Sequence, residues 1–273
     1  MSIADRPLHC LGCKVSHNTF EMSEFDLSAL YDAGCRGIEL DIHQEPSKWE
    51  WNVFHTGRWD PNKPKLSAYL EQLHEWVNED LQMRRDPFFV ILDLKNGNWT
   101  SPDFPDRLDD YILDCLPDTS RIFSPVDLVF TGGSLYDHVA KVGWPALRHL
   151  RGQLIFWLSG SETGKRRYAL SGPAKHLCFS DLETNSQSIQ DSGQQVLLNV
   201  KYDVFNASTY RTLSSRMWSK RALLSRAYNV NSSRAIQTMK KEAPRFNLLA
   251  VSEDLALDKS QAGKGFWDTG APL

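Results

Sequence analysis

Residues 87–95 read PFFVILDLK, an apolar run that is interrupted only by Asp93 before Lys95 ends it. A run of this kind, without polar alternation, is typical of a strand that is covered on both faces in a parallel sheet. In the preceding segment, Leu66 to Leu81, apolar residues recur at steps of three and four, which predicts a long helix with one apolar stripe. A helix followed directly by a buried strand indicates a parallel α/β arrangement.

The alternation of strand and helix continues along most of the chain. Further helices are expected over Glu24–Ala33, near Leu108–Cys115 and near Ser233–Lys241. A closed barrel has eight parallel strands, so one of nine candidates must be wrong, and we expect it to be Val196–Val200 or Leu177–Phe179. The candidate strands are Leu11–Val15, Gly37–Ile42, Phe88–Leu94, Leu128–Phe130, Leu154–Leu158, Leu177–Phe179, Val196–Val200, Leu223–Tyr228 and Leu248–Val251.

These patterns predict an α/β protein with a single (β/α)8 barrel of the TIM type, which need not be regular. The length of 273 residues suits one such domain. A doubly wound open sheet is the alternative, but Ser16–Phe20, after the first strand, lacks the glycine-rich phosphate turn of that fold. We assign residues 1–257 to the barrel and residues 258–273 to a C-terminal tail that wraps loosely around it or frays.

The charge balance and the apolar runs exclude several classes of protein. Lys and Arg number 31 and Asp and Glu number 34, which gives a net charge of −3. A protein that binds nucleic acid through its charge usually has a basic excess, so no nucleic-acid partner is expected. No apolar run reaches the roughly 18 residues of a membrane span. The N-terminal residues do not resemble a secretory signal, so a cytoplasmic location is the default expectation, with non-standard secretion left open.

The cysteines indicate neither a disulfide framework nor a zinc site. The chain has five, an odd number spread over a long sequence. Cys10 and Cys13 form a C-x-x-C pair, but no second pair follows at a suitable spacing. We interpret them as small buried thiols next to the first strand.

Polar side chains gather where the first three predicted strands end. His17 and Asn18 follow the first strand, and Glu39 and Asp41 lie two positions apart on the second, so that both face the same side of the sheet. Asp93 and Lys95 repeat this spacing on the third strand. In a parallel barrel the carboxyl ends of the strands meet at one rim, where the catalytic groups of such barrels are found.

These residue types suit a metal ion and a phosphate ester. Glu39, Asp41 and Asp93 supply carboxylates and Asn18 an amide oxygen, a set that favours Ca²⁺ or Mg²⁺ over zinc. Lys95 could neutralise phosphate oxygens beside such an ion, and two histidines could handle protons. Each feature alone also has an explanation without function. An exposed Asp-x-Lys pair, for example, can be a simple ion pair that contributes less than about 1 kcal/mol to stability. The combination, in barrel order, favours a functional site.

Three sequence segments resemble a known family. They are SHNTF at 16–20, GCRGIELD at 34–41 and FHTG at 54–57, and they are similar to the X-region of calcium-dependent phosphoinositide-specific phospholipase C. That family belongs to the PLC-like phosphodiesterases, which include glycerophosphodiester phosphodiesterases and sphingomyelinase D-type enzymes. The resemblance covers Cys10–Lys95, about a third of the chain, and implies a barrel of the TIM type.

The resemblance also implies roles for five residues. His17 would stabilise the pentavalent phosphorane, and His55 would be the general acid that protonates the leaving alcohol. Asn18, Glu39 and Asp41 would hold Ca²⁺, with one carboxylate also able to act as the base. A neighbouring hydroxyl of the substrate would attack phosphorus and give a cyclic phosphate, so no protein nucleophile is needed.

One departure leaves alternatives open. The run Asp93-Leu94-Lys95 is more similar to sphingomyelinase D-type enzymes, in which the aspartate binds Mg²⁺ and the lysine contacts phosphate. A sphingomyelinase D-like or glycerophosphodiester phosphodiesterase is therefore the first alternative. The second is a barrel that binds a phosphorylated ligand without catalysis.

Two further features concern the substrate. Arg226, near the end of a predicted strand, could reach a substrate phosphate from the far side of the barrel mouth. The expected partner is a phosphodiester, most simply a phospholipid or its headgroup. An aromatic segment before His55 could make transient contact with a membrane surface or could simply pack against the barrel rim. Its aromatic residues are Trp49, Trp51 and Phe54, and Trp59 follows shortly after His55.

Overall fold

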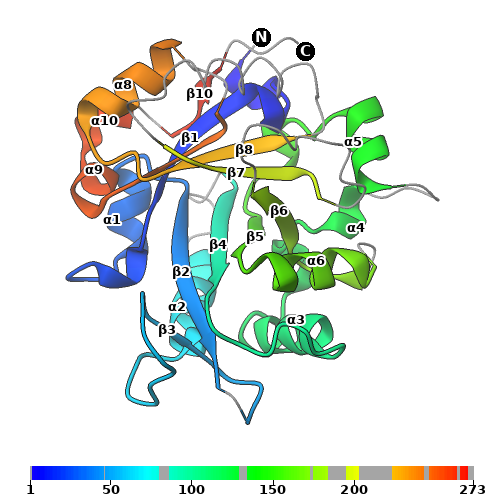
Figure 1. The fold of residues 1–273 in the computed structure, drawn as a ribbon. Coiled ribbons are helices and arrows are strands. Elements are labelled where there is room, and N and C mark those ends of the chain that lie inside the picture. The colour runs from blue at the N-terminus through cyan, green and yellow to red at the C-terminus, as the bar shows by residue number, and fades with distance from the viewer. Residues whose placement is uncertain are drawn as a thin grey trace.

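The barrel is assembled from parallel strands in the order expected of a TIM-type fold. The computed structural model describes residues 2–45, 47–79, 86–128, 134–172, 175–183, 195–202, 223–242, 246–262 and 265–269. Within these residues, neighbouring parallel strands follow the order β1-β9-β8-β7-β6-β5-β4-β2 (Figure 1). Their bounds are β1 Leu11–Ser16, β2 Gly37–Gln44, β4 Phe88–Leu94, β5 Leu154–Gly160, β6 Phe179–Glu183, β7 Leu197–Lys201, β8 Leu224–Tyr228 and β9 Leu248–Val251. The predicted α/β class is confirmed.

The two ends of this parallel series, β1 and β2, meet at a narrow contact. A single parallel bridge pairs Lys14 with Cys35, and the backbone N–H of Arg36 donates to the Lys14 carbonyl over 2.8 Å. Two short antiparallel strands flank the series. β3 (Trp51–Val53) pairs with β2, and β10 (Trp267–Asp268), from the C-terminal tail, pairs with β1.

Helices surround the strands and connect most of them (Figure 1). The segments expected to be helical near 24–33, 66–81, 108–115 and 233–241 coincide in large part with α1, α2, α3 and α8, and α3 begins four residues earlier than expected. Among the described residues, no helix combines the length and the apolar composition that crossing a membrane would require. The helices are α1 Leu27–Asp32, α2 Leu66–Glu79, α3 Phe104–Cys115, α4 Pro125–Leu128, α5 Leu135–Val142, α6 Glu162–Leu170, α8 Ser233–Glu242, α9 Glu253–Leu257 and α10 Lys259–Ala262.

The expectation about the superfluous strand was wrong. Both suspected segments overlap real strands: β6 begins at the last residue of Leu177–Phe179, and β7 covers most of Val196–Val200. In contrast, Leu128 of the candidate Leu128–Phe130 is the last residue of helix α4. Residues 129–130 lie outside the described part of the chain. Short apolar runs do not distinguish a strand from a buried helical turn, and Pro125 at the first position of α4 is the signal that favours the helix.

The strands separate two apolar layers. Along β4, Phe89 and Ile91 belong to the core inside the barrel, whereas Val90 and Leu92 pack in the layer between strands and helices. Because side chains alternate along a strand, Asp93 falls on the same side as Ile91 and so faces the inside. The same alternation turns Glu39 and Asp41 inward, since their neighbours on β2 belong to the outer layer.

Candidate active site

A cavity of about 790 Å³ lies at the carboxyl ends of the strands. All eight residues predicted for the site meet here. Seven of them line the cavity: His17, Asn18, Glu39, His55, Asp93, Lys95 and Arg226. The eighth, Asp41, is fully buried and touches two of the seven, His55 and Lys95.

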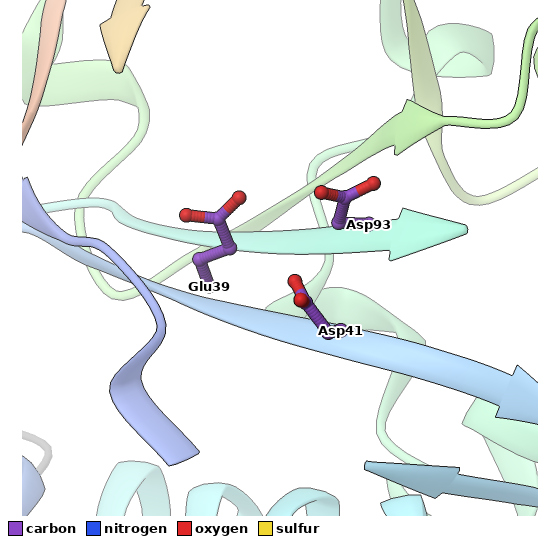
Figure 2. A group of neighbouring side chains, drawn as sticks. All are labelled: Glu39, Asp41 and Asp93. Carbon is purple, nitrogen blue, oxygen red and sulfur yellow. The ribbon is translucent and has the colours of Figure 1, made fainter. Parts of the chain in front are cut away.

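Three carboxylates lie side by side on the inner face of β2 and β4 (Figure 2). Asp41 is paired in register with Asp93 on the neighbouring strand, and Glu39 precedes Asp41 by two positions on the same face. One oxygen from each carboxylate lies within 4.8 Å of the others. Gly160 at the end of β5, with φ +78°, leaves the room that Asp93 needs, because a Cβ there would lie 2.0 Å from Asp93 Oδ1. Asp93 is thus held against its neighbours by the strand register and by the absence of a side chain.

Lys95 joins two of these carboxylates. Its Nζ donates to Asp93 Oδ2 over 2.7 Å and lies 3.2 Å from Asp41 Oδ2. Burial alone would lower the pKa of Lys95, but the charges of Asp93 and Asp41 outweigh it, and the pKa is raised. The lysine is therefore a permanent positive charge within the cluster.

Arg226 neutralises the third carboxylate from the far side of the barrel. Its Nη2 donates to Glu39 Oε2 over 2.5 Å, and its Nη1 donates to Asn199 Oδ1 over 3.2 Å. Asn199 in turn donates to the Ser159 hydroxyl over 3.0 Å. This chain of hydrogen bonds links β8, β7 and β5 to β2 and fixes the guanidinium at the cavity wall.

Burial shifts the protonation of the two carboxyls on β2. It raises the pKa of Glu39 to about 7, with Arg226 opposing the shift and Asp93 and Asp41 adding to it. It also raises the pKa of Asp41 to about 6, with further help from the charge of Asp93. Crowded buried carboxylates favour protons or cations, so the cluster is built to take up positive charge.

His55 stands at the rim of the cavity, held by a buried aspartate. Its Nδ1 lies 2.9 Å from Asp41 Oδ2, while 48 % of its side chain is exposed. The segment that carries it is anchored on both sides. His43 stacks on Phe54 with ring centroids 3.6 Å apart, and Asn96 donates to the Gly57 carbonyl over 2.8 Å.

His17 lies opposite, above Glu39. Its backbone N–H donates to the Val251 carbonyl over 2.8 Å, and its Nε2 lies 3.6 Å from Glu39 Oε2. Burial, together with the nearby charge of Arg226, lowers the pKa of His17 to about 4. The imidazole is therefore neutral near pH 7 and can donate a hydrogen bond from one nitrogen.

Asn18 occupies a left-handed turn directly after β1, with φ 51° and ψ 47°. Its amide nitrogen donates to Glu21 Oε2 over 3.2 Å and lies 3.4 Å from His55 Nδ1. Asparagine tolerates this backbone conformation better than most residues. The turn places the amide between the two histidines at the cavity wall.

The donor set fits a hard divalent cation. Oδ1 of Asp41 and Oδ1 of Asp93 are both buried and have no hydrogen-bond partner. Buried acceptors without partners are rare in proteins, and here two of them belong to carboxylates that share one cluster. Oxygen ligands of this kind suit Ca²⁺ or Mg²⁺.

Among the residues of the cavity wall that sequence reasoning missed, two have side chains that contact the predicted site. Tyr228 lies beside His17, with ring centroids 6.2 Å apart, and its position two residues after Arg226 already predicts the same face. Asn199 holds Arg226, but it lies on one of the two strands that were expected to include the false one. A polar residue in the middle of that apolar run was the available signal.

The aromatic segment before His55 is largely packed into the protein. Trp51 is 0 % exposed and Phe54 is 6 % exposed, so both contribute to the barrel rim. Trp49 is partly buried against the same core. Transient contact of this segment with a membrane stays a prediction.

Comparison with known proteins shows the fold. No protein-family model matches the chain, and no curated protein sequence matches it. Among solved structures, a calcium-dependent phosphoinositol-specific phospholipase C from Pseudomonas sp. is 19% identical, with 97% of this chain and 96% of that chain covered and a TM-score of 0.75. A Ca²⁺-dependent phosphatidylinositol-specific phospholipase C from Streptomyces antibioticus is 15% identical, with 97% and 99% covered and a TM-score of 0.75.

A larger relative has the same barrel. L. pealei PLC21 is 13% identical and has a TM-score of 0.62, with 97% of this chain but only 37% of that chain covered. The chain therefore shares its fold with these phospholipases C, as the motifs of its first third predict.

Proposed function

We propose that this protein is a metal-dependent phosphodiesterase of the phospholipase C type that acts on a phosphoinositide or a related phosphodiester. One observation carries the proposal: two histidines line a cavity together with Lys95 and Arg226, next to a cluster of three carboxylates. The fold that the chain shares with calcium-dependent phospholipases supports it.

The positive groups of the cavity would bind the phosphate. Lys95 and Arg226 both line it, and each can donate to a non-bridging oxygen while keeping its carboxylate partner. Glu39, Asp41, Asp93 and Asn18 would hold the divalent cation, Ca²⁺ in the first place and Mg²⁺ as the alternative. When bound, that cation would neutralise charge that builds up on the phosphate.

His55 would act as the general acid. With Nδ1 bound to the Asp41 carboxylate, Nε2 is the nitrogen left to exchange a proton with the leaving oxygen. The exposed half of the side chain gives it access to substrate at the rim. Asp41 would fix the orientation of the ring, as the third group of a catalytic relay does.

His17 would stabilise negative charge on the phosphoryl group. As a neutral imidazole it can donate one hydrogen bond to an oxygen whose charge grows as the transition state forms. The nucleophile would be a hydroxyl of the substrate itself, and a carboxylate of the cluster would accept its proton. Attack from within the substrate gives a cyclic phosphate without any nucleophile from the protein.

Product analysis tests this proposal. Phosphatidylinositol in mixed micelles is incubated with the protein, with and without EDTA, and the products are followed by phosphorus NMR. We expect a cyclic inositol phosphate that disappears when EDTA is present or when His17 or His55 is replaced by alanine. Full activity in EDTA would remove the metal from the mechanism, and absence of turnover on every phosphodiester would favour a binding barrel.

The pairing of Lys95 with Asp93 favours a second candidate, a sphingomyelinase D-like or glycerophosphodiester phosphodiesterase. Such an enzyme would cleave the bond on the other side of phosphorus or act on a deacylated headgroup. The same NMR experiment with lysophosphatidylcholine and with a glycerophosphodiester distinguishes it, because the phosphorus signal of the released group differs.

A further inference from the structure

In every carboxylate of the cluster, one oxygen already contacts a positively charged side chain of the protein. Glu39 Oε2 accepts from Arg226, and Asp93 Oδ2 accepts from Lys95. Asp41 Oδ2 lies 2.9 Å from His55 Nδ1 and 3.2 Å from Lys95 Nζ. The unpartnered oxygens of the two aspartates are the Oδ1 atoms.

From this distribution of contacts we infer that Lys95 is a tethered counter-ion that competes with a divalent cation for Asp41 and Asp93. The inference rests on the proposed function, because it concerns the cation that the cluster would hold. It adds that the lysine weakens cation binding and keeps the carboxylates together while no cation is bound.

The backbone places the ammonium group of Lys95 next to the carboxylate cluster. Lys95 directly follows the last residue of β4, two positions after Asp93, so that the two side chains point to the same side. The backbone N–H of Lys95 donates to the Ile42 carbonyl over 3.0 Å, which ties this end of β4 to β2. Only 28 % of the lysine side chain is exposed. Its charge therefore stays with the two aspartates.

The contacts of Lys95 also limit how a cation can be bound. While Lys95 Nζ bonds both Oδ2 atoms, Asp41 and Asp93 can each offer a cation one oxygen only. Ca²⁺ sites commonly use six to eight oxygens and a carboxylate that binds through both of its own. A cation in this cluster must either bind through one oxygen from each aspartate or displace the ammonium group of Lys95. Both alternatives reduce the affinity for the cation.

Removing the charge of Lys95 should therefore tighten cation binding. We expect Lys95→Met to bind Ca²⁺ and Mg²⁺ about tenfold more tightly or better, because a positive charge about 3–4 Å from the ligand oxygens is lost. Lys95→Gln, which keeps a hydrogen-bond donor, should show the same direction. Lys95→Arg keeps the charge and should stay close to the wild type.

The test measures the metal alone. Isothermal titration calorimetry with CaCl₂ and with MgCl₂ gives the affinity of chelator-treated wild type and of each variant. Lys201→Met is the matched control, because Lys201 lines the same cavity, while the carboxylates that Lys95 contacts are Asp41 and Asp93. Thermal unfolding supplies a second readout: without cation the Met variant should melt below the wild type, and Ca²⁺ should raise its melting temperature by more.

Each outcome has one meaning. Tighter binding in the Met and Gln variants, but not in the Lys201 control, supports the inference, as does binding that appears only when Lys95 is removed. Equal or weaker binding in both variants overturns it and leaves the proposed function intact. Absence of cation binding in the wild type and in all variants overturns both proposals.

Discussion

Arg226 and Glu39, 187 positions apart in the sequence, form a buried ion pair across the inside of the barrel, with 2.5 Å between Nη2 and Oε2. Neither residue is more than 1 % exposed. Removing one partner of a buried pair usually costs more than the pair contributes, because it leaves an uncompensated charge in the interior. The pair therefore makes the stability of the barrel depend on pH in a way that a variant can reveal.

Arg226→Met should destabilise the chelator-treated protein by up to about 3–5 kcal/mol above pH 8 and by much less below pH 6. Burial raises the pKa of Glu39 to about 7, so below that pH the folded wild type already holds a protonated carboxyl. Above it, the wild-type carboxylate ionises beside the guanidinium, whereas the variant must keep it protonated or bury its charge. Stability is thus lost in the variant as pH rises. Urea unfolding across this pH range measures the difference.

The double variant Arg226→Met/Glu39→Gln is the control for this prediction. It carries no ionisable group at either position, so most of the loss at high pH should disappear. A destabilisation of Arg226→Met that is the same at pH 5.5 and pH 8.5 would mean that packing of the long side chain, rather than its charge, stabilises the barrel.

His55→Ala should lose turnover selectively on substrates with a poor leaving group. A general acid contributes about a hundredfold to ten-thousandfold when an alcohol must leave as a neutral molecule. An aryl phosphodiester releases a stable phenolate and needs no such proton, so on it the loss should be about tenfold or less. Steady-state kinetics on matched alkyl and aryl esters make the comparison.

Two other histidines, His17 and the surface residue His74, serve as comparisons for His55→Ala. His17 would act on the phosphoryl oxygens, so its removal should slow both esters by a similar factor. His74, on the outside in helix α2, should be replaceable by alanine without effect on either. An equal loss on both esters in His55→Ala would exclude the role of general acid.

Cation binding should release protons near pH 6 and strengthen as pH rises. Burial raises the pKa of Glu39 to about 7 and that of Asp41 to about 6, so both carry protons in part at pH 6. A cation binds the deprotonated forms, and its apparent affinity should be about tenfold weaker at pH 6 than at pH 8. Calorimetry in two buffers with different ionisation enthalpies counts the protons, and Glu39→Gln should release fewer. An affinity independent of pH would contradict the burial that these pKa shifts reflect.

The hydrogen bonds of Asn96 should matter for turnover but not for cation binding. Asn96 donates to the Gly57 carbonyl over 2.8 Å and lies 3.4 Å from Nδ1 of His43, whose Nε2 lies 2.9 Å from the Phe54 carbonyl. These contacts hold the segment on both sides of His55. Asn96→Ala should reduce kcat about tenfold, because small displacements of a catalytic group are costly.

An asparagine elsewhere in the same segment is the control for Asn96. Asn62 bonds only to Asp60 among the hydrogen bonds of its side chain described here, so Asn62→Ala should leave kcat unchanged. The calorimetric affinity for Ca²⁺ should be the same in both variants and in the wild type. A loss of cation affinity in Asn96→Ala would show that the residue supports the carboxylate cluster instead.

How much the sequence could predict differs between the two halves of the barrel. Near the N-terminus, local spacing was sufficient: Glu39 and Asp41 share a face by the alternation of β2, and the register with β4 adds Asp93. In the second half, strands are short and neighbouring apolar runs look alike. There Asn199, the residue that orients Arg226, was placed on a doubtful strand.

Contacts between distant segments were beyond pattern analysis. No spacing rule pairs Arg226 with Glu39, since the two meet only after the parallel strands are arranged around the barrel. The same holds for Lys95: its place beside Asp93 follows from alternation, but its contact with Asp41 depends on the register of two strands. No sequence pattern points to Gly160, because its role is to leave space for the carboxylate of Asp93.

Gly160→Ala should disturb both the cation site and the backbone around it. A Cβ at this position would lie 2.0 Å from Asp93 Oδ1 and 2.5 Å from the Leu94 carbonyl oxygen, so the Asp93 carboxylate has to leave its present position. The positive φ of +78° adds backbone strain of about 1–2 kcal/mol. Gly172 separates the two effects, because its φ is +119° and its nearest neighbour would be 3.8 Å from an added Cβ. Both variants should unfold at lower urea concentrations, but only Gly160→Ala should weaken Ca²⁺ binding in calorimetry, by about tenfold or more. Unchanged Ca²⁺ affinity in Gly160→Ala would mean that Asp93 is not a ligand.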